Sequence, residues 1–502
     1  MSTSQKTGLW IGILAAVFIL VFVELDYRNP ALTKMAAIAL LMAIWWMTEA
    51  IPLAATSLVP LILFPLTGLM KGEEIASAYI NSVIFLFLGG FMLAIAMENS
   101  GLHKRIALKI ITMFGASINS IILGFMFSTA FLSMWISNTA TAVMMLPIAM
   151  SIIAKIEAAF GTERTRNFSK SLMLSIAYAC SIGGIATLIG TPPNLAFVKI
   201  LSILFPQAPE ISFGTWMLLC LPVTIILLFF TYFLLTRVQF VSDKNLSISK
   251  NLINDEYQKL GKISFDEKSV GMVFLTTALL WIFRTELNLG FAKIPGWSLI
   301  LPNPDFIDDG IIAVMMASSL FFIPSKSNEA GKSGILDSTV FSKVPWSIIL
   351  LFGGGFALAK GFTSTGLSEF IGAQFNGMQN LSPVLIVLTT AIVINFLTEL
   401  TSNTATAQMI LPVVASVSVA IGLNPLMLMI TAALSASMAF MLPVATPPNT
   451  VVFASGKLKI IDMVKAGVIL NITSVIIISL LVYLLGSILF SLHDFPDWAI
   501  IK

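Results

Sequence analysis

Two short polar motifs, each present twice, stand out in an otherwise apolar sequence. Ser-Asn-Thr-Ala-Thr-Ala occupies residues 137–142 and again 402–407, and Thr-Pro-Pro-Asn occupies 191–194 and again 446–449. A Ser-Asn-Thr segment before an apolar run can cap the following helix, whose first N–H groups are then free to donate to a carboxylate. Two successive prolines remove two N–H groups and oppose helical continuation, which exposes carbonyl oxygens suited to Na⁺. The motifs therefore predict a site for a carboxylate ligand together with a hard cation.

The charge balance of such a site favours a cation that binds with the ligand. Each helix N-terminus is worth about half an elementary positive charge, so two of them supply about one. Asn138, Thr139, Asn403 and Thr404 add side-chain donors, and neither motif contains Lys or Arg. A dicarboxylate would remain under-neutralised in this site. Cations held by the neighbouring carbonyls would close the gap, which is a physical reason for coupling.

Each feature also has a plainer interpretation. An isolated Asn before an apolar helix is usually only a cap, and an isolated Pro-Pro in a membrane helix is more often a kink. Repetition of both motifs favours the binding site. Three acids, Glu49, Glu98 and Glu399, lie in or near apolar runs, where acidic residues are functional candidates. For Glu399 we favour a tie between a hairpin and its neighbour over direct ligand contact, because one carboxylate repels another.

The composition excludes several classes of protein. Of the 502 residues, 57% are hydrophobic and 11% are charged, whereas soluble domains carry about 25% charged residues. The missing polar surface predicts a membrane protein. A net charge of +3 without a long basic block argues against nucleic-acid binding. Two cysteines and two histidines are too few for a disulfide framework, a zinc site or His-centred catalysis, so we expect no enzyme and no cofactor.

The apolar runs predict an all-α multi-pass membrane protein with eleven transmembrane helices. Two further blocks, 117–158 and 382–423, are each about twice the length of one span and are interrupted midway by Ser-Asn-Thr. Backbone leaves the helix at membrane depth only where protein or a water-filled cavity satisfies it. We therefore expect both blocks to be re-entrant helical hairpins whose tips lie inside the protein.

The two halves of the chain repeat each other. The Ser-Asn-Thr motifs are 265 residues apart (402 − 137), and the Thr-Pro-Pro-Asn motifs are 255 apart (446 − 191). Five crossings separate matching spans, and because this number is odd the halves must be inverted relative to each other. Inverted repeats with broken helices are the architecture of secondary transporters, whose site lies near the membrane midplane.

The repeats and the distribution of basic residues define the predicted domains and orientation. Cytoplasmic loops carry the excess of Lys and Arg, which places the N-terminus in the cytoplasm and the C-terminus outside. The predicted units are a first transmembrane helix (1–29), a first repeat with the hairpin 117–158 (30–238) and a cytoplasmic linker (239–266). They are followed by a second repeat with the hairpin 382–423 (267–492) and a C-terminal tail (493–502).

The sequence resembles the divalent-anion:sodium symporter family. The resemblance rests on Trp-Trp-Met-Thr-Glu-Ala-Ile-Pro-Leu at 45–53 and on the two doubled motifs, and it runs from about residue 30 to 480. It implies a homodimer, with a fixed scaffold domain and a transport domain that carries both hairpins and slides as an elevator. The sodium ligands that it implies are, at the first site, Ser133, Ser137, Asn138 and the carbonyl of Gly190, and at the second, Thr398, Thr401, Asn403 and the carbonyl of Ala445. The residues that it implies for the dicarboxylate are Asn138, Thr139, Asn403, Thr404 and Pro447.

These features together predict a sodium-coupled symporter in the cell (inner) membrane that imports C4-dicarboxylates such as succinate, fumarate and malate. The first alternative is a sodium-independent exchanger of 2-oxoglutarate or citrate, since exchangers in the family share the hairpin motifs. An intramembrane enzyme is disfavoured because no nucleophile–base pair or metal cluster lies at membrane depth. A channel is disfavoured because a doubled, dead-ended hairpin site suits occlusion better than conduction.

The predicted orientation can be tested with single cysteines in a variant that lacks Cys180 and Cys220. A cysteine in the loop 363–380 should react with an impermeant thiol reagent added outside, because that loop contains no Lys or Arg. A cysteine in the basic loop 161–170 should not react. The opposite labelling pattern would show that the charge-based orientation is inverted.

Overall fold

The computed structural model describes residues 1–115, 117–243, 251–289, 292–326 and 334–500. The described chain is predominantly helical and includes one antiparallel pair of two-residue strands, β1 (Leu287–Asn288) and β2 (Lys293–Ile294). Eight of the helices in these ranges are long and apolar enough to cross a membrane. The prediction of a multi-pass helical membrane protein is confirmed. The number of eleven crossings remains a prediction.

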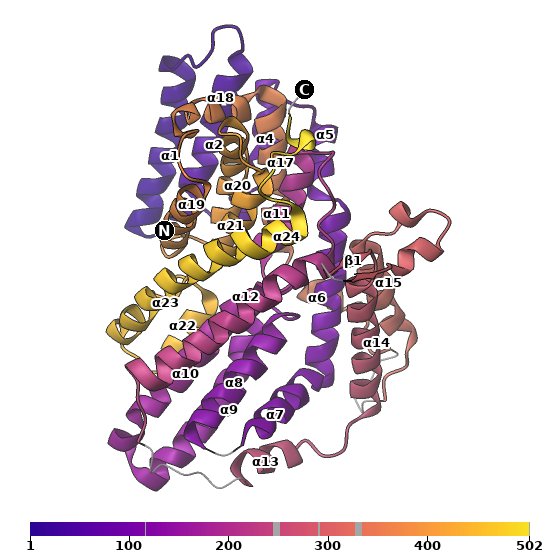
Figure 1. Ribbon diagram of the computed structural model, residues 1–502, viewed down its shortest axis with the longest axis vertical. Helices are drawn as coiled ribbons and strands as arrows, with labels where there is room; N and C mark the ends of the chain where they lie inside the picture. The colour runs from indigo at the N-terminus through magenta and orange to yellow at the C-terminus, as the bar shows by residue number, and fades with distance from the viewer. Residues whose placement is uncertain (116, 244–250, 290–291, 327–333, 501–502) are drawn as a thin grey trace.

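The first half begins with helices that lead up to the first hairpin. These are α1 (Thr3–Phe22), α2 (Pro30–Thr48), α3 (Leu53–Thr56), α4 (Val59–Thr67), α5 (Gly72–Tyr79), α6 (Ser82–Ser100) and α7 (Leu102–Phe114). The rest of this half comprises α8 (Ile118–Ser133), α9 (Asn138–Phe160), α10 (Thr162–Gly184), α11 (Pro192–Leu204), α12 (Phe213–Phe233) and the π-helical turn η1 (Leu234–Gln239). Figure 1 shows α1 and α2 at one end of the molecule and α7 near the other.

The second half begins with the predicted linker 239–266, of which residues 244–250 lie outside the described residues. Its helices are α13 (Asn251–Gln258), α14 (Phe265–Ile282), α15 (Asp309–Phe322), α16 (Val340–Lys343), α17 (Trp346–Thr365), α18 (Leu367–Ala373), α19 (Pro383–Thr398), α20 (Asn403–Ala420), α21 (Pro425–Ser435), α22 (Pro447–Phe453), α23 (Ile460–Leu481) and α24 (Ser487–Phe490). Short 3₁₀ or π turns are η2 (Trp297–Ile300), η3 (Pro304–Phe306), η4 (Asn376–Met378), η5 (Val482–Gly486) and η6 (Asp497–Ala499). The long helices α12 and α23 lie against each other across the middle of the molecule (Figure 1).

The two Ser-Asn-Thr blocks each form two helices joined by a four-residue turn. The turns are 134–137, between α8 and α9, and 399–402, between α19 and α20. In the first turn the hydroxyl of Ser137 accepts a hydrogen bond from the amide of Ala140 at 3.2 Å, as an N-cap does. Helices α8 and α19 have 16 residues each, which at about 1.5 Å per residue is shorter than a hydrocarbon core of about 30 Å. The second arms, α9 and α20, are among the eight helices that are long enough to cross, so the re-entrant hairpins remain a prediction.

The Thr-Pro-Pro-Asn motifs coincide with helix interruptions, but the prolines lie on the helical side of each break. Non-helical backbone runs over 185–191 and 436–446, and Pro192 and Pro447 are the first residues of α11 and α22. Proline fits the first helical position because its missing N–H has no intrahelical partner there. The exposed carbonyls therefore come from the residues before the prolines.

The repeat extends to the glycines that end matching helices. Gly101 follows α6 and Gly366 follows α17, with φ angles of 77° and 78°. This left-handed conformation favours glycine, and in both halves it allows a new helix, α7 or α18, to start at the next residue. The sequence repeat is therefore also a repeat of backbone geometry.

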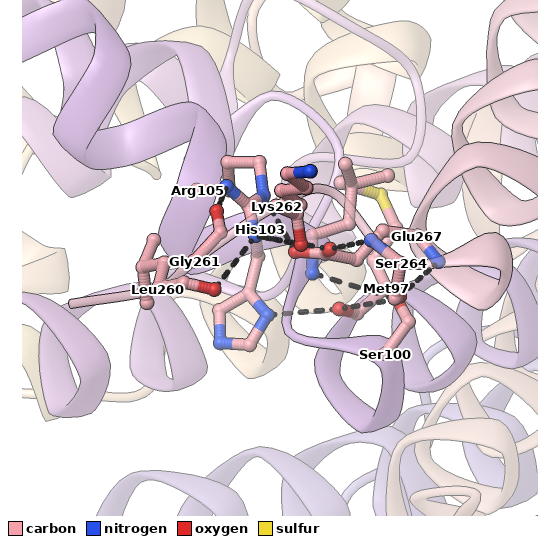
Figure 2. A network of polar contacts seen from close by, with 10 residues as sticks. Met97, Ser100, His103, Arg105, Leu260, Gly261, Lys262, Ser264 and Glu267 are labelled. Atoms are coloured by element: carbon pink, nitrogen blue, oxygen red, sulfur yellow. Dashed lines mark hydrogen bonds and ion pairs between the residues drawn. The ribbon is translucent and has the colours of Figure 1, made fainter. Parts of the chain in front are cut away.

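Helix α7 is anchored by a buried guanidinium, that of Arg105 (Figure 2). Arg105 donates to both carboxylate oxygens of Glu267 in α14, at 2.7 and 3.1 Å. Its other bonds go to carbonyls of the segment between α13 and α14, those of Leu260, Gly261 and Lys262. The residue 265 positions later is Phe370, so α18 has no equivalent cation. The cage ties the helix before the first hairpin to the start of the second half.

The first structural prediction concerns this cage. Replacing Arg105 with Ala leaves the buried Glu267 carboxylate without its cation, and the free energy of unfolding should fall by about 3–5 kcal/mol. The matched control is Lys155→Ala, whose ion pair with Glu256 is more exposed and should be worth less than about 1 kcal/mol. Thermal unfolding of both variants in detergent measures the difference. Equal unfolding temperatures would contradict a stabilising role for the cage.

Candidate functional site

Both Ser-Asn-Thr turns and both helix breaks face one cavity of about 820 Å³. Nine of the eleven residues predicted for the site line it. They are Ser137, Asn138, Thr139, Gly190, Thr401, Asn403, Thr404, Ala445 and Pro447. The structure thus brings together motifs that are up to about 300 residues apart, as the inverted repeat predicted.

The other two predicted residues, Ser133 and Thr398, are fully buried behind the cavity wall. Each is the last residue of the first helix in its block, and its hydroxyl oxygen lies within hydrogen-bond distance of the side-chain amide of the Asn that begins the next helix. The distance is 2.6 Å from Ser133 to Asn138 and 2.7 Å from Thr398 to Asn403. They therefore stand behind the two asparagines rather than beside the ligand space.

In the first half, oxygen atoms crowd around the Asn138 amide. Ser133 Oγ also lies 2.8 Å from the carbonyl oxygen of Cys180, although its hydroxyl has only one hydrogen. If the amide turns its nitrogen toward this cluster, it donates to Ser133 Oγ at 2.6 Å, to the Cys180 carbonyl at 3.2 Å and to the Gly190 carbonyl at 3.3 Å. If it presents its oxygen instead, the same oxygen atoms can be bridged by a cation. This arrangement is chemically suited to Na⁺.

The second half repeats this arrangement. Thr398 Oγ1 lies 2.7 Å from Asn403 Oδ1 and 2.8 Å from the carbonyl oxygen of Ala436. The carbonyls of Cys180 and Ala436 belong to α10 and to the start of the second break, and neither was predicted as part of the site. A main-chain carbonyl carries no signal in the residue type, so only the packing of the break against the hairpin identifies it.

The two halves differ in how the turn is tied to the break. In the first half, the Thr187 hydroxyl donates to the Met134 carbonyl and accepts from the Gly190 amide. In the second half, the residue matching Met134 is Glu399 (134 + 265). Its carboxylate accepts from the amide nitrogens of 440, 441 and 442 at 2.6, 2.9 and 3.2 Å. The sequence repeat gave no indication of this difference in chemistry.

The three acids singled out from the sequence have different environments. Glu399 also accepts from Asn471 Nδ2 at 2.7 Å, so it ties the turn to two neighbouring segments, as predicted. Glu49 lines the cavity and ends α2 with a φ of 47°, a left-handed conformation that is uncommon outside glycine. Glu98 does not belong to the cavity lining.

The side chain of Thr401 is already engaged within its own block. Its hydroxyl donates to the Leu397 carbonyl at 3.0 Å and shares a hydrogen bond with Thr406 Oγ1 at 2.5 Å. Thr401 lines the cavity, but its hydroxyl is turned toward the helices. A contribution to a cation site would therefore come from its main chain.

The cavity has an unusual charge distribution for an anion site. Among the described residues that line it, two are glutamates, Glu49 and Glu399, and none is Lys or Arg. Positive potential comes from helix N-termini, since α9 and α20 begin at the cavity with Asn138 and Asn403. The protein thus provides N–H donors for an anion and oxygen clusters for cations, without a basic side chain.

Two parts of the wall were not predicted from the sequence. Ser2, Ser4 and Gln5 of the N-terminal segment line the cavity, and the first two are exposed at its edge. Phe87 and Phe91 of α6 add an apolar wall. Helix α1 reaches the site by packing against α2, where the Trp45 indole donates to the Leu9 carbonyl at 3.2 Å. No local motif in the first residues signals this position.

Comparison with known proteins identifies the family of this chain. The model of the family described as "sodium:sulfate symporter transmembrane region" matches residues 5–492. A relative from Staphylococcus saprophyticus, the sodium-dependent dicarboxylate transporter SdcS, is 43% identical over 96% of this chain and 92% of its own length. Its namesake from Staphylococcus aureus is 44% identical over 96% of this chain and 91% of its own length.

Solved structures of transporters share the fold at low identity. The YdaH transporter of Alcanivorax borkumensis superimposes with a TM-score of 0.55 at 13% identity, over 89% of this chain and 98% of its own. MtrF of Neisseria gonorrhoeae gives a TM-score of 0.56 at 13% identity, over 91% of this chain and 96% of its own. At this identity the likeness concerns the fold alone.

The second structural prediction concerns Glu399. In Glu399→Gln, the new amide nitrogen must face main-chain N–H groups that the carboxylate now accepts from, so the free energy of unfolding should fall by about 1.5–3 kcal/mol. Glu369→Gln is the matched control, because Glu369 is exposed in α18 and its loss should cost less than about 1 kcal/mol. Thermal unfolding in detergent compares the two. If both variants unfold at the wild-type temperature, the tie is not stabilising.

Proposed function

This chain belongs to the family of the sodium:sulfate symporter transmembrane region, and from that premise we propose that it is a sodium-coupled symporter that imports C4-dicarboxylates such as succinate, fumarate and malate. Support comes from two relatives above 40% identity that are named sodium-dependent dicarboxylate transporters. The site itself supplies an independent argument, because its charge alone does not balance a dicarboxylate.

The observation that carries the proposal is the pairing of an anion cavity with oxygen clusters. The cavity contains two glutamates and no basic side chain among its described lining residues. The N-termini of the two hairpin helices supply about one positive charge, which is less than the two negative charges of a dicarboxylate. A dianion is retained only when cations enter with it. This requirement makes sodium part of the binding site rather than an accessory to it.

We assign one sodium ion to each oxygen cluster. The first would be bound by Ser133, Ser137, Asn138 and the carbonyl of Gly190, and the second by Thr398, Thr401, Asn403 and the carbonyl of Ala445. The Cys180 and Ala436 carbonyls, each 2.8 Å from the cluster hydroxyl, are additional ligand candidates. The dicarboxylate would lie between Asn138, Thr139, Asn403, Thr404 and Pro447, which all line the cavity.

The membrane arrangement completes the proposal. We place the chain in the cell (inner) membrane with eleven crossings, two re-entrant hairpins, the N-terminus in the cytoplasm and the C-terminus outside. Because Ser2 and Ser4 lie at the edge of the cavity, this orientation gives a cavity that opens toward the cytoplasm. Alternating access would come from a transport domain with both hairpins that slides as an elevator along a scaffold domain in a homodimer.

The third prediction is that sodium and succinate strengthen each other's binding by the same factor. Linkage between two equilibrium sites is reciprocal, and a coupling of about 5- to 150-fold is typical. The measurement is a binding titration of succinate on purified protein in detergent, at zero and high Na⁺, followed by the reverse titration of Na⁺ with and without succinate.

Choline balances the ionic strength in every sample, so that general screening is constant. If specific succinate binding has the same affinity at zero and high Na⁺, the symporter proposal fails. Counterflow without sodium in reconstituted vesicles would then support the exchanger alternative for the same motifs.

A further inference from the structure

The Asn of each Thr-Pro-Pro-Asn motif makes the same unusual contacts in both halves. Asn194 Nδ2 lies 2.7 Å from the Thr187 carbonyl oxygen and 3.3 Å from that of Gly184, which are seven and ten residues earlier. Asn449 Nδ2 lies 3.0 Å from the Leu442 carbonyl and 3.3 Å from that of Ala439, at the same two spacings. Because the hydrogen bonds recur at the same sequence spacings, the two asparagines have the same structural role in the two repeats.

The prolines of the motif complement this amide. The carbonyl of Gly190 would ordinarily bond to the N–H of a residue two to four positions later. The residues two and three positions later are Pro192 and Pro193, which have no N–H. The next amide, that of Asn194, donates to the Thr191 carbonyl at 3.2 Å instead. The Gly190 carbonyl is therefore left free of its local donors.

The second half leaves the Ala445 carbonyl free in the same way. Pro447 and Pro448 have no N–H, and the amide of Asn449 donates to the Thr446 hydroxyl at 3.3 Å. In each half, the asparagine side chain thus binds carbonyls from the start and middle of the break, while the prolines free the carbonyl just before the motif. The freed carbonyl of Gly190 lies 3.3 Å from the side-chain amide of Asn138, and that of Ala445 occupies the matching position in the repeat (445 − 190 = 255).

We propose that Asn194 and Asn449 are positioning residues for the two sodium sites: by closing the rest of each break, they hold the carbonyl of Gly190 or Ala445 at its cation. Both side chains are fully buried and neither belongs to the cavity lining, so they act through the main chain and not by contact with substrate. This inference rests on the proposed function. It adds two residues that position the sodium ligands but do not themselves contact the substrate.

Burial in a membrane protein makes this role specific to asparagine. Main-chain carbonyls of the break cannot be satisfied by lipid, so a side-chain donor must reach them. An aspartate of the same shape has no donor, and an alanine leaves the carbonyls free to turn. In either case the break relaxes, and the cation loses a preorganised ligand. Groups that orient metal ligands from behind typically change metal affinity by about 10- to 100-fold when they are removed.

The test measures sodium dependence separately from succinate affinity in Asn194→Ala and Asn449→Ala. Uptake of labelled succinate into vesicles should need about 10-fold or more Na⁺ for half saturation. At saturating Na⁺, the KM for succinate should return to within about twofold of wild type, because substrate contacts are intact. The matched control is Asn424→Ala. Asn424 is a buried asparagine whose side chain donates to the Asp494 carbonyl at 3.2 Å, and it does not belong to the cavity lining. It should leave the sodium dependence unchanged.

A second readout does not require transport. Sodium should raise the unfolding temperature of purified wild-type protein relative to choline without succinate, and the alanine variants should need a higher Na⁺ concentration for the same rise. If a variant does not fold, Asn194→Ser or Asn449→Ser retains one donor and should show a smaller shift in the same direction.

The outcomes separate this inference from the function on which it rests. A wild-type protein with no sodium dependence would overturn the proposed function. A sodium-dependent wild type, together with variants that lose only maximal rate or stability, would overturn the positioning role alone.

Discussion

The organisation of this protein depends on one constraint, the need to satisfy main-chain polar groups where helices are interrupted inside a membrane protein. The two breaks, 185–191 and 436–446, are mostly buried inside the protein, where their polar groups must find partners within the chain or in a ligand. Their polar groups are bound by asparagine amides, by the Thr187 hydroxyl and by the Glu399 carboxylate. What these groups leave unbound is available to a ligand. The site is therefore defined by which backbone atoms are not satisfied.

The same constraint explains how one cavity accommodates opposite charges. Helix N-termini at Asn138 and Asn403 present N–H groups, while a main-chain carbonyl lies beside each cluster hydroxyl, that of Cys180 beside Ser133 and that of Ala436 beside Thr398. Donors suit a carboxylate and oxygens suit a cation, so neither ligand requires a charged side chain. With two glutamates already in the wall, the balance favours joint binding of the anion with its cations. The coupling between anion binding and cation binding therefore follows from the positions at which the helices begin and end beside the cavity.

The repeats match in backbone but not in every side chain. Thr187 bridges turn and break in the first half, whereas the carboxylate of Glu399 performs the corresponding task in the second. Arg105 fixes α7 to the segment before α14, and its repeat partner Phe370 cannot do so. The two repeats thus share a backbone geometry, but different side chains connect them to the neighbouring segments.

The sequence by itself determined the membrane class, the repeat and the helix boundaries at the motifs, because apolar length, proline and capping residues act locally. It also predicted nine of the residues that line the cavity, since each of these lies within or beside a repeated motif, but not the N-terminal segment or the phenylalanines of α6. Only the tertiary structure decided that Ser133 and Thr398 lie behind the wall and that the Cys180 and Ala436 carbonyls join them. It likewise decided the cage around Arg105, whose partner Glu267 is 162 residues away. The physical reason is that hydrogen bonds between distant segments, and bonds to main-chain carbonyls above all, depend on how helices pack and not on residue type.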